Sequence, residues 1–403
     1  MNRIICTSTL LLLLALAGCL AAAPLPEAAS TAPAATPMLV LSPTSPPATA
    51  TPSATPMPSA TATPAPTEIP SPTLLPQPVH LLRSYPIDGD SDVLPGAPLR
   101  LVFNQPMDPD PAALGLSVSP ELSLTAEWPA PNTLALHTGP RRPGTEYRLT
   151  LQRARGQSGG MLEQPLAFTF GEGGRGAPIP ILMYHHVDDF GPSAPAGVGE
   201  WASRPGEFVA QLDLLAGLSA HVVRLIETVD YLTEGAPLPA RPAVITFDDG
   251  NKPTLQYAVP VLQERGLPAT FFVPPQYAES GNDKFFNWED LKALAAAGFD
   301  LGGHSYQHSF VQDLTPAEAE HQIGDEKRKI EELTGAQVEC FAYPFGSYSD
   351  KTVQQLQHYG YRAALTVEQR IYQKPGDIFH LGRIRMGYGD PIDKLRSKLP
   401  WSE

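Results

Sequence analysis

Two acidic residues and two histidines in the second half of the chain have the types and spacing of a hydrolytic metal site. Asp248 and Asp249 are adjacent and precede Gly250, whereas His304 and His308 lie four residues apart. Neighbouring side chains of a regular strand face opposite ways, so both aspartates can face one site only where the chain bends, which a glycine at position 250 permits. Two imidazoles and one carboxylate form a three-ligand shell that leaves a coordination position for water. Each pattern alone is common, but together they favour metal-assisted hydrolysis.

Strands and helices are predicted to alternate from about residue 177 onward. The candidate strands are 179–184, 222–225, 243–247, 269–273, 299–301, 338–342, 361–365 and 381–386, and the candidate helices are 205–217, 254–265, 287–297, 315–334 and 350–358. This alternation favours either a parallel barrel or a doubly wound sheet, whose sites lie where strands end and loops begin. The aspartate pair directly follows one candidate strand, and the first histidine follows another, so the polar residues stand where such a fold places its sites.

Residues 79–173 have a different pattern, with short alternating apolar runs separated by Pro, Gly and Asn. The runs at 99–103, 122–128, 133–136, 147–151 and 166–170 are typical of strands. Strands spaced by turns in this way predict a small β-sandwich. The segments 103–108 and 143–147 resemble the bacterial Ig-like modules of surface proteins. No cluster here could hold a metal or a nucleophile, so we expect a spacer or a weak binding module.

Proline is concentrated near the start of the chain. Sixteen of the 46 prolines lie between Pro24 and Pro78, in a stretch with no Lys or Arg and only two acidic residues. Such a composition cannot bury enough apolar surface to offset the entropy lost on ordering, so residues 19–78 are predicted to be a disordered Pro/Thr/Ala-rich tether. An extended polyproline II spacer of this length reaches roughly 180 Å, at about 3.1 Å per residue.

The first residues have the pattern of an export signal. Arg3 precedes an apolar run at 10–16 that is too short to span a bilayer and that ends in small residues. The segment ending in Cys19 resembles the lipobox of bacterial lipoproteins, which implies a signal peptide at 1–18 and a lipid anchor on Cys19. A secretory signal cleaved near residue 23 is the alternative. The cysteine count favours the lipoprotein, because Cys340 then has no partner for a disulfide. We therefore expect a membrane-anchored protein on the outer side of the cytoplasmic membrane or at the cell surface.

Three ordered motifs carry a family resemblance. The segments TFDDG at 246–250, HSYQH at 304–308 and FAYPFG at 341–346 resemble the polysaccharide deacetylases of the NodB-homology type, carbohydrate esterase family four. The resemblance spans about residues 178–390 and implies a distorted (β/α) barrel that hydrolyses N-acetyl groups of amino-sugar polymers. The FAYPFG form is similar to the branch that includes poly-N-acetylglucosamine deacetylases. We therefore expect a barrel domain at 177–403, preceded by the Ig-like sandwich and the tether.

The resemblance assigns the metal-centre roles by position. Asp249, His304 and His308 are expected to bind a divalent metal, and Asp248 to act as the general base. Zinc is the default for one carboxylate and two imidazoles, with cobalt or nickel as alternatives. The ion lowers the pKa of a bound water and polarises the acetyl carbonyl, while the free carboxylate accepts the proton.

The third motif and its surroundings supply the remaining expected site residues. The family places a backbone N–H at the position of Phe345, which together with Tyr343 is expected to serve the oxyanion or the substrate. Many members begin this motif with an arginine that orients the base, whereas this chain has Ala342. We expect Arg383 to replace that arginine, with Arg385 as the alternative.

A leaving amine must be protonated, which calls for an acid near the metal. Many members end their last motif in a histidine that follows a leucine, but the corresponding part of this chain reads FHLGRIR at 379–385. The branch with the FAYPFG form also has a Tyr-His near the start of the barrel, which matches His185. We therefore assign the general acid to His185, with His380 as the second choice.

The net charge and the candidate site residues are together compatible with three functions. Of the net charge of −14, residues 173–403 carry −10, from 20 basic and 30 acidic residues, which argues against nucleic acid, against anionic lipid and against an anionic substrate. The first function is metal-dependent deacetylation of a neutral N-acetylated glycan at the cell envelope. The second is a deacetylase-like module that only binds glycan, since the usual arginine is missing. The third, an amidase or esterase on another acyl substrate, shares the same metal chemistry.

Overall fold

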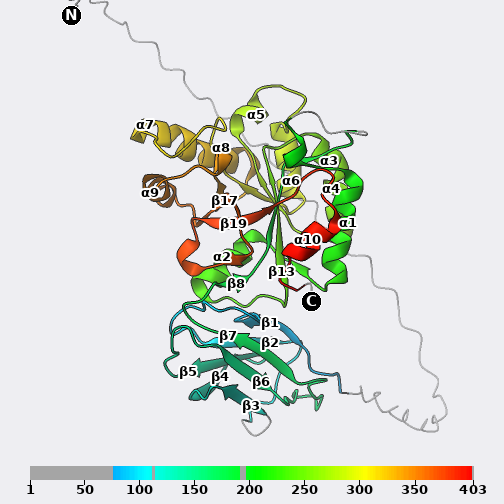
Figure 1. Ribbon diagram of the computed structural model, residues 1–403, viewed down its shortest axis with the longest axis vertical. Coiled ribbons are helices and arrows are strands. Elements are labelled where there is room, and N and C mark those ends of the chain that lie inside the picture. Colours follow the sequence, from blue (N-terminus) through cyan, green and yellow to red (C-terminus); the bar gives the residue numbers. More distant parts are fainter. Residues whose placement is uncertain (1–75, 111–113, 191–196, 402–403) are drawn as a thin grey trace, which may run out of the picture. The chain divides into compact units, whose positions relative to one another are not determined.

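Two kinds of sheet organise the chain. The computed structural model describes residues 76–110, 114–190 and 197–401 (Figure 1). Antiparallel strands come first, and a parallel sheet with helices follows from about residue 177. The predicted signal peptide at 1–18, Cys19 and nearly all of the tether predicted at 19–78 lie outside the described residues. Within the described ranges, no helix is both long and apolar enough to cross a membrane.

Within the residues that the structure describes, seven antiparallel strands form the first domain. They are β1 (Leu81–Tyr85), β2 (Leu99–Phe103), β3 (Leu116–Ser119), β4 (Leu124–Ala130), β5 (Thr133–Thr138), β6 (Tyr147–Leu151) and β7 (Leu166–Phe170). One sheet has the order β1-β2-β5-β4 and the other β3-β6-β7. With the strands lettered A to G along the chain, these orders are ABED and CFG, which are the orders of a constant-type immunoglobulin sandwich. On β2 the alternation buries Leu99, Leu101 and Phe103 in the core, as the strand period of two requires.

In the described part of the second domain, seven parallel strands follow one another in a nearly closed barrel, and the short strand β12 (His221–Val222) pairs with one of them off this path. The seven are β9 (Ile181–Tyr184), β13 (Pro242–Asp248), β14 (Thr270–Phe272), β15 (Asp300–Gly302), β16 (Cys340–Ala342), β17 (Ala363–Gln369) and β19 (Leu381–Arg385). Their order is β15-β14-β13-β9-β19-β17-β16. A parallel bridge between Gly303 and Phe341 joins the two ends of this order. The barrel is therefore the correct alternative, and the doubly wound sheet is not.

Helices lie around the outside of the ring of strands (Figure 1). They are α1 (Pro205–Gly217), α2 (Leu225–Glu234), α3 (Pro253–Tyr257), α4 (Val259–Arg265), α5 (Pro275–Glu279), α6 (Trp288–Ala296), α7 (Pro316–Ala319), α8 (Glu326–Thr334), α9 (Asp350–His358) and α10 (Ile392–Lys398). Short elements are the 3₁₀ turns η2 (Gly199–Trp201), η4 (Pro344–Gly346) and η5 (Pro375–Asp377), the π turn η3 (Glu320–Asp325) and the strands β8 (Ala177–Pro178), β10 (His186–Val187), β11 (Ala202–Ser203), β12 (His221–Val222) and β18 (Tyr372–Gln373).

Several predicted elements differ from the observed ones for local reasons. The single helix predicted at 254–265 is divided at Ala258, because Pro260 lies in the first turn of α4 and cannot donate the hydrogen bond that would continue α3. The strand predicted at 222–225 ends early, because a helix starts at Leu225. There the N–H of Arg224 is capped by the carboxylate of Glu227, which lies 3.0 Å away.

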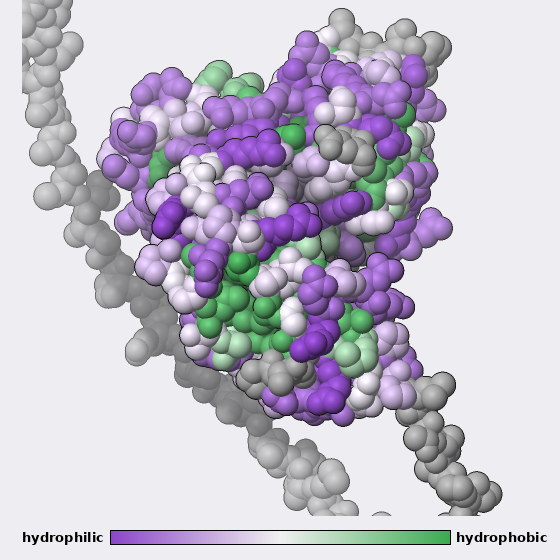
Figure 2. All heavy atoms as spheres, turned by 60° about the horizontal axis from the view of Figure 1, so that its bottom comes forward, coloured by the Kyte–Doolittle hydropathy of each residue, from purple (hydrophilic) through white to green (hydrophobic). Residues whose placement is uncertain are grey.

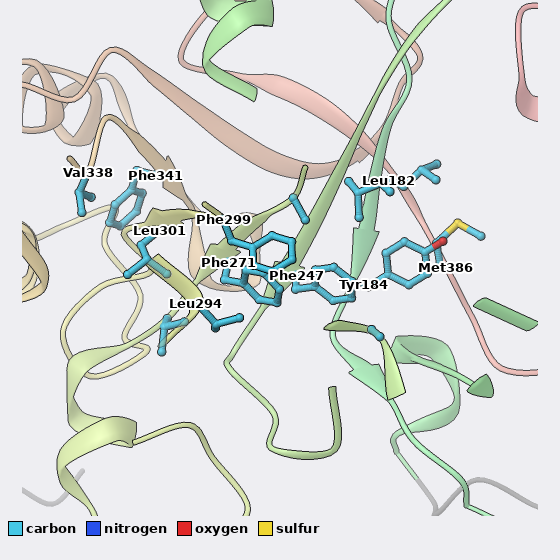
Figure 3. Close-up of a cluster of buried hydrophobic side chains, with 14 of the residues drawn as sticks. Leu182, Tyr184, Phe247, Phe271, Leu294, Phe299, Leu301, Val338, Phe341 and Met386 are labelled. Carbon is cyan, nitrogen blue, oxygen red and sulfur yellow. The ribbon is translucent and has the colours of Figure 1, made fainter. Parts of the chain in front are cut away.

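A layer of aromatic side chains packs against the strands that carry the site, on the side of the strands that faces the helices. On β13, Ala243, Ile245 and Phe247 belong to this outer core, whereas the alternate residues face the barrel interior. Figure 3 shows Phe247 and Phe271 side by side, and their parallel rings are 4.9 Å apart. Tyr184 of β9 stacks on the other side of Phe247 at 5.3 Å. These contacts hold β9, β13 and β14 in register, and hence also their carboxyl ends.

The surface is mainly polar. On the face that Figure 2 shows, hydrophilic side chains predominate, and hydrophobic ones form one larger group with smaller groups elsewhere. In the described part of the chain, the large hydrophobic side chains that are well exposed are Leu82, Met161, Phe310, Phe345 and Ile392. Phe310 and Phe345 stack on each other with their ring centres 4.4 Å apart. An exposed aromatic pair of this kind often marks a binding surface.

Replacing Phe271 by alanine is expected to lower the free energy of unfolding by about 3–5 kcal/mol, because it opens a cavity in a dry core. Phe271 is fully buried and also contacts Phe299 edge to face. Phe310→Ala removes a ring that is 61% exposed and should change stability by no more than about 0.5 kcal/mol. Urea unfolding of a soluble chain that begins at residue 72 measures both variants. Equal losses in the two would contradict the packing described above.

Candidate active site and metal centre

The two adjacent aspartates face the same mouth of the barrel because the backbone turns at the second one. Asp248 is the last residue of β13, and its side chain points into the barrel like that of Thr246, two residues earlier. Asp249 has a positive φ of 69°, and Gly250 follows with 71°. The bend therefore begins at Asp249, one residue before the glycine to which the sequence assigned it. A positive φ is uncommon for a residue with a side chain and is typical of functional sites.

The second and third motifs lie across the barrel mouth from this turn. His304 and His308 follow β15 in a loop, where Ser305 and His308 both have a φ of 54°. The Nε2 atoms of His304 and His308 lie 3.3 Å and 3.2 Å from Oδ1 of Asp249. The ligand atoms of all three residues lie within 4.8 Å of one another. The structure thus brings together the three residues that were predicted to bind metal.

The donor atoms of this cluster suit a divalent cation. Nδ1 of His304 lies 2.7 Å from the carbonyl oxygen of Ala342, which can only accept, so Nδ1 carries the hydrogen and Nε2 presents its lone pair. Oδ1 of Asp249 is buried and makes no hydrogen bond within the described residues, although two imidazole nitrogens lie close to it. The lone pair of His304 Nε2 and the carboxylate oxygen of Asp249 face each other at 3.3 Å and repel one another unless a cation lies between them. One carboxylate and two imidazoles fit zinc, cobalt or nickel.

Asp248 is held as a free carboxylate by a buried ion pair. Both of its oxygens accept from Arg383, at 2.8 Å and 2.7 Å, and Arg383 also donates to the carbonyl of Thr366. Desolvation alone would raise the pKa of Asp248, but the charge and the hydrogen bonds of Arg383 outweigh it and hold the pKa below its ordinary value. The carboxylate is therefore ionised and available as a base at neutral pH.

Of the two arginines considered for the base, the structure brings only Arg383 to Asp248. Arg385 lies two residues further along β19, so it reaches the rim of the barrel. Its guanidinium packs over the Trp201 ring at 4.6 Å and lies 3.3 Å from the carboxylate of Glu200. Arg383 thus occupies the place that the sequence left open when the third motif began with Ala342.

His185 lies beside the base, and His380 does not. Nε2 of His185 is 3.8 Å from Oδ2 of Asp248, and its ring packs on Trp201 at 4.7 Å. Burial lowers the pKa of His185 to about 4, although Asp248 and Asp249 oppose the shift. The imidazole is therefore neutral at pH 7. His380 precedes the amino end of β19, opposite the site, where its ring stacks on Tyr348.

The third motif places one of its two expected residues at the site. Phe345 has a φ of 60°, is 55% exposed, and its ring lies 4.6 Å from that of His308. Within the described residues no backbone acceptor takes its N–H, which leaves this donor for a ligand. Tyr343 is different. Its side chain is fully buried and its hydroxyl donates to the carbonyl of Phe379 at 3.1 Å, so the prediction that Tyr343 contacts substrate is wrong.

Two residues that sequence reasoning missed adjoin the site. Trp201 packs on His185, and no local pattern in the sequence identifies it. Glu326 is fully buried and accepts a hydrogen bond from the backbone N–H of His304. A signal for Glu326 was present, because it lies on the same face of the predicted helix as the buried Ile323 and Ile330. An acidic residue on an apolar helix face is unusual and calls for a specific partner.

Comparisons with known proteins agree with this arrangement. Residues 235–364 match the family model described as polysaccharide deacetylase. The Bacillus subtilis protein YxkH is 27% identical over 214 residues, which are 53% of this chain and 73% of that protein. The poly-beta-1,6-N-acetyl-D-glucosamine N-deacetylase of Staphylococcus epidermidis is 23% identical over 190 residues, 44% of this chain and 65% of the relative. The chain thus spans less than two thirds of the second relative.

Solved structures show the same fold. The deacetylase PplD of Streptococcus pyogenes aligns with a TM-score of 0.50 at 23% identity, over 55% of this chain and 97% of that one. BC0361, a polysaccharide deacetylase of Bacillus cereus, aligns with a TM-score of 0.50 at 19% identity, over 80% of this chain and all of that one. The second alignment covers more of the chain than the barrel domain alone occupies. Residues 235–364 thus match the polysaccharide deacetylase model, and the chain shares its fold with solved deacetylase structures.

Proposed function

We propose that the protein removes N-acetyl groups from an N-acetylglucosamine-containing polysaccharide in a metal-dependent hydrolysis. One observation carries the proposal. An Asp-His-His cluster with converging acceptor atoms lies beside a second carboxylate that is kept ionised, buried and outside the cluster by Arg383. A hydrolytic site needs this separation of ligand and base. The names of two relatives, the deacetylase from Staphylococcus epidermidis and a chitooligosaccharide deacetylase from Azorhizobium caulinodans, support the substrate class.

The residues divide the reaction between them. Asp249, His304 and His308 would hold a divalent metal, zinc by default, whose chemistry is to polarise the acetyl carbonyl and to lower the pKa of water. Asp248 accepts the proton of the attacking water, because its pKa lies below the ordinary value and its carboxylate is free of the ligand cluster. The unpaired N–H of Phe345 donates to the oxyanion that forms on the acetyl carbon.

The second proton transfer uses the group next to the base. Breaking the carbon–nitrogen bond releases acetate and requires a proton on the departing amine. His185 is neutral at pH 7, so it can act as the acid only after it has received a proton. Asp248 holds the proton taken from water, and the two side chains are 3.8 Å apart. We propose that the proton passes from Asp248 through His185 to the amine.

Aromatic side chains on both sides of the site suit a sugar polymer. Phe345 lies beside His308 and stacks on Phe310, and Trp201 lies beside His185. Trp201 also lines a groove of about 930 Å³, whose other walls include Arg385 and Tyr388. Sugar rings pack their C–H faces on such rings, which supports a polymer over a small acyl substrate. The glycan-binding module without activity is less favoured, because Arg383 supplies the missing partner of the base.

We also propose that the protein is an envelope lipoprotein. The lipobox-like segment that ends in Cys19 supports an anchor, and the Pro-rich composition of residues 19–78 supports a tether. The ABED and CFG strand orders support an Ig-like module at 79–173. The alignment with the Bacillus cereus structure extends beyond the barrel and supports the same arrangement of domains. An anchored enzyme of this kind would reach polymer at some distance from its membrane.

Metal removal tests the proposed function directly. The protein is expected to release acetate from N-acetylglucosamine oligomers, to lose this activity in EDTA and to regain it with zinc. His304→Ala should lose both zinc and activity, because it removes one of three ligands. His358→Ala removes an exposed histidine at the end of α9 and serves as the matched control. Acetate release that EDTA leaves unchanged would contradict metal dependence.

Asp248→Asn separates the base from the ligands. The amide keeps the shape of the side chain but cannot accept the proton, so turnover should fall by about 10²–10⁴-fold while zinc affinity stays within a few-fold of the parent. Zinc titration and acetate assays on the same preparation give both values. Retained turnover would refute the assignment of the base, and lost zinc would make Asp248 a ligand.

Arg383→Lys tests how the base is tuned. Lysine keeps the charge but loses the bidentate pair, so the pKa of Asp248 should rise. A base with a higher pKa stays protonated to a higher pH, so the acidic limb of the kcat/KM profile should move upward. Arg385→Lys, on the same strand but paired with Glu200, should leave the limb in place. The opposite pattern in the two variants would show that Arg385 orients the base.

A further inference from the structure

A buried carboxyl that the proposed mechanism does not use lies behind the metal site. Glu326 begins α8, and its exposed fraction is 0%. One of its oxygens accepts the backbone N–H of His304, and the other lies 3.2 Å from the hydroxyl of Tyr361. Within the described residues, no lysine or arginine forms an ion pair with it. Burial away from water raises the pKa of its carboxyl well above the ordinary value.

Residues of η3 and α8 accept hydrogen bonds from three backbone N–H groups of the loop at 304–308. Besides the bond from His304, the N–H of Tyr306 donates to the carbonyl of Gln322 at 3.0 Å. The N–H of Gln307 donates to the side-chain oxygen of Gln322 at 3.1 Å, and the two glutamine side chains are paired at 2.8 Å. Gln322 lies in the π turn η3, which runs directly into α8. Single π turns of this kind are frequent at functional sites.

Hydrogen bonds on two sides fix the position of His304. The ring of His304 is oriented by Ala342 on one side, and its backbone is anchored by Glu326 on the other. The preceding Gly303 leaves no free space, because an added Cβ would lie 2.4 Å from the Tyr361 hydroxyl and 2.9 Å from the Glu326 carboxylate. His304 therefore has one available position, with Nε2 directed at Asp249.

Packing alone does not account for a carboxyl at this position. An acidic side chain buried without a cationic partner costs free energy, and an apolar side chain of similar volume would fill the space at lower cost. The cost is offset only by what the oxygens bind, and one of them binds the backbone of a metal ligand. The site, rather than the core, therefore explains Glu326.

We propose that Glu326 is a positioning residue for the metal centre, which sets metal affinity by accepting the backbone N–H of His304. The inference rests on the proposed function, because it concerns the same three ligands. When a residue that hydrogen-bonds and orients a metal ligand is replaced, metal affinity typically falls by about 10–100-fold. Glu326 touches neither metal nor substrate, so its effect should appear in metal binding and leave the KM for substrate unchanged.

The test compares two substitutions of Glu326 with a matched control on the same helix. Glu326→Gln keeps an oxygen that accepts the His304 N–H, and Glu326→Leu removes it. Glu332→Leu removes an exposed carboxylate further along α8. Zinc affinity, measured on the full chain by competition with a chelating dye, should fall about 10–100-fold in Glu326→Leu. It should stay within about threefold of the parent in Glu326→Gln and Glu332→Leu, a small change on the scale of one lost hydrogen bond.

Two results for zinc affinity would overturn the proposal. Parent-like zinc affinity in Glu326→Leu would reduce Glu326 to a packing residue. A loss in Glu326→Gln as large as in Glu326→Leu would mean that the negative charge, and not the acceptor, matters. If Glu326→Leu does not fold, as judged by circular dichroism, the absorption spectrum of the cobalt-loaded Glu326→Gln protein decides. A parent-like spectrum supports the positioning role, and an altered one contradicts it. A parent protein that binds no zinc would instead refute the metal site itself.

Discussion

The left-handed backbone at Asp249 is the constraint on which the rest of the site depends. A regular strand would send the carboxylates of Asp248 and Asp249 to opposite faces of the sheet. The positive φ of Asp249 instead keeps both at the barrel mouth, yet aims them at different partners. Asp248 meets Arg383 inside the barrel, and Asp249 meets His304 and His308 at its rim. One backbone torsion thus gives two chemically identical neighbours different partners, as their proposed roles of base and metal ligand require.

The buried pair of Asp248 and Arg383 shows what the barrel interior contributes. The side chains are 2% and 0% exposed, so both charges have been removed from water. That removal costs several kcal/mol per ion and is offset only by close geometry and additional hydrogen bonds. Thr366 and Thr246 provide such bonds to the guanidinium. A buried, rigid carboxylate is poorly explained by stability, whereas the proposed role as a base requires it to keep its charge and its direction.

The sequence predicted the parts of the molecule that follow from periodicity and from motif order. The bounds of α1 and α9 are those predicted from the apolar pattern, and the three ordered motifs supplied every residue of the metal cluster. Contacts between distant segments were harder, because no local pattern records which side of a strand a given arginine or tyrosine occupies. Arg383 could be predicted only as one of two candidates, and Tyr343 was placed at the substrate although it turns into the core. Glu326 could have been found as an acidic residue on an apolar helix face.

Anomalous diffraction at the zinc edge, from crystals of the zinc-loaded protein, tests most directly whether Asp249 binds the metal and Asp248 does not. The account predicts one peak about 2.0–2.2 Å from an oxygen of Asp249 and from Nε2 of both His304 and His308. Asp248 should remain paired with Arg383 and should not coordinate the ion. Zinc bound through Asp248, or held at a different place in the barrel, would contradict the account.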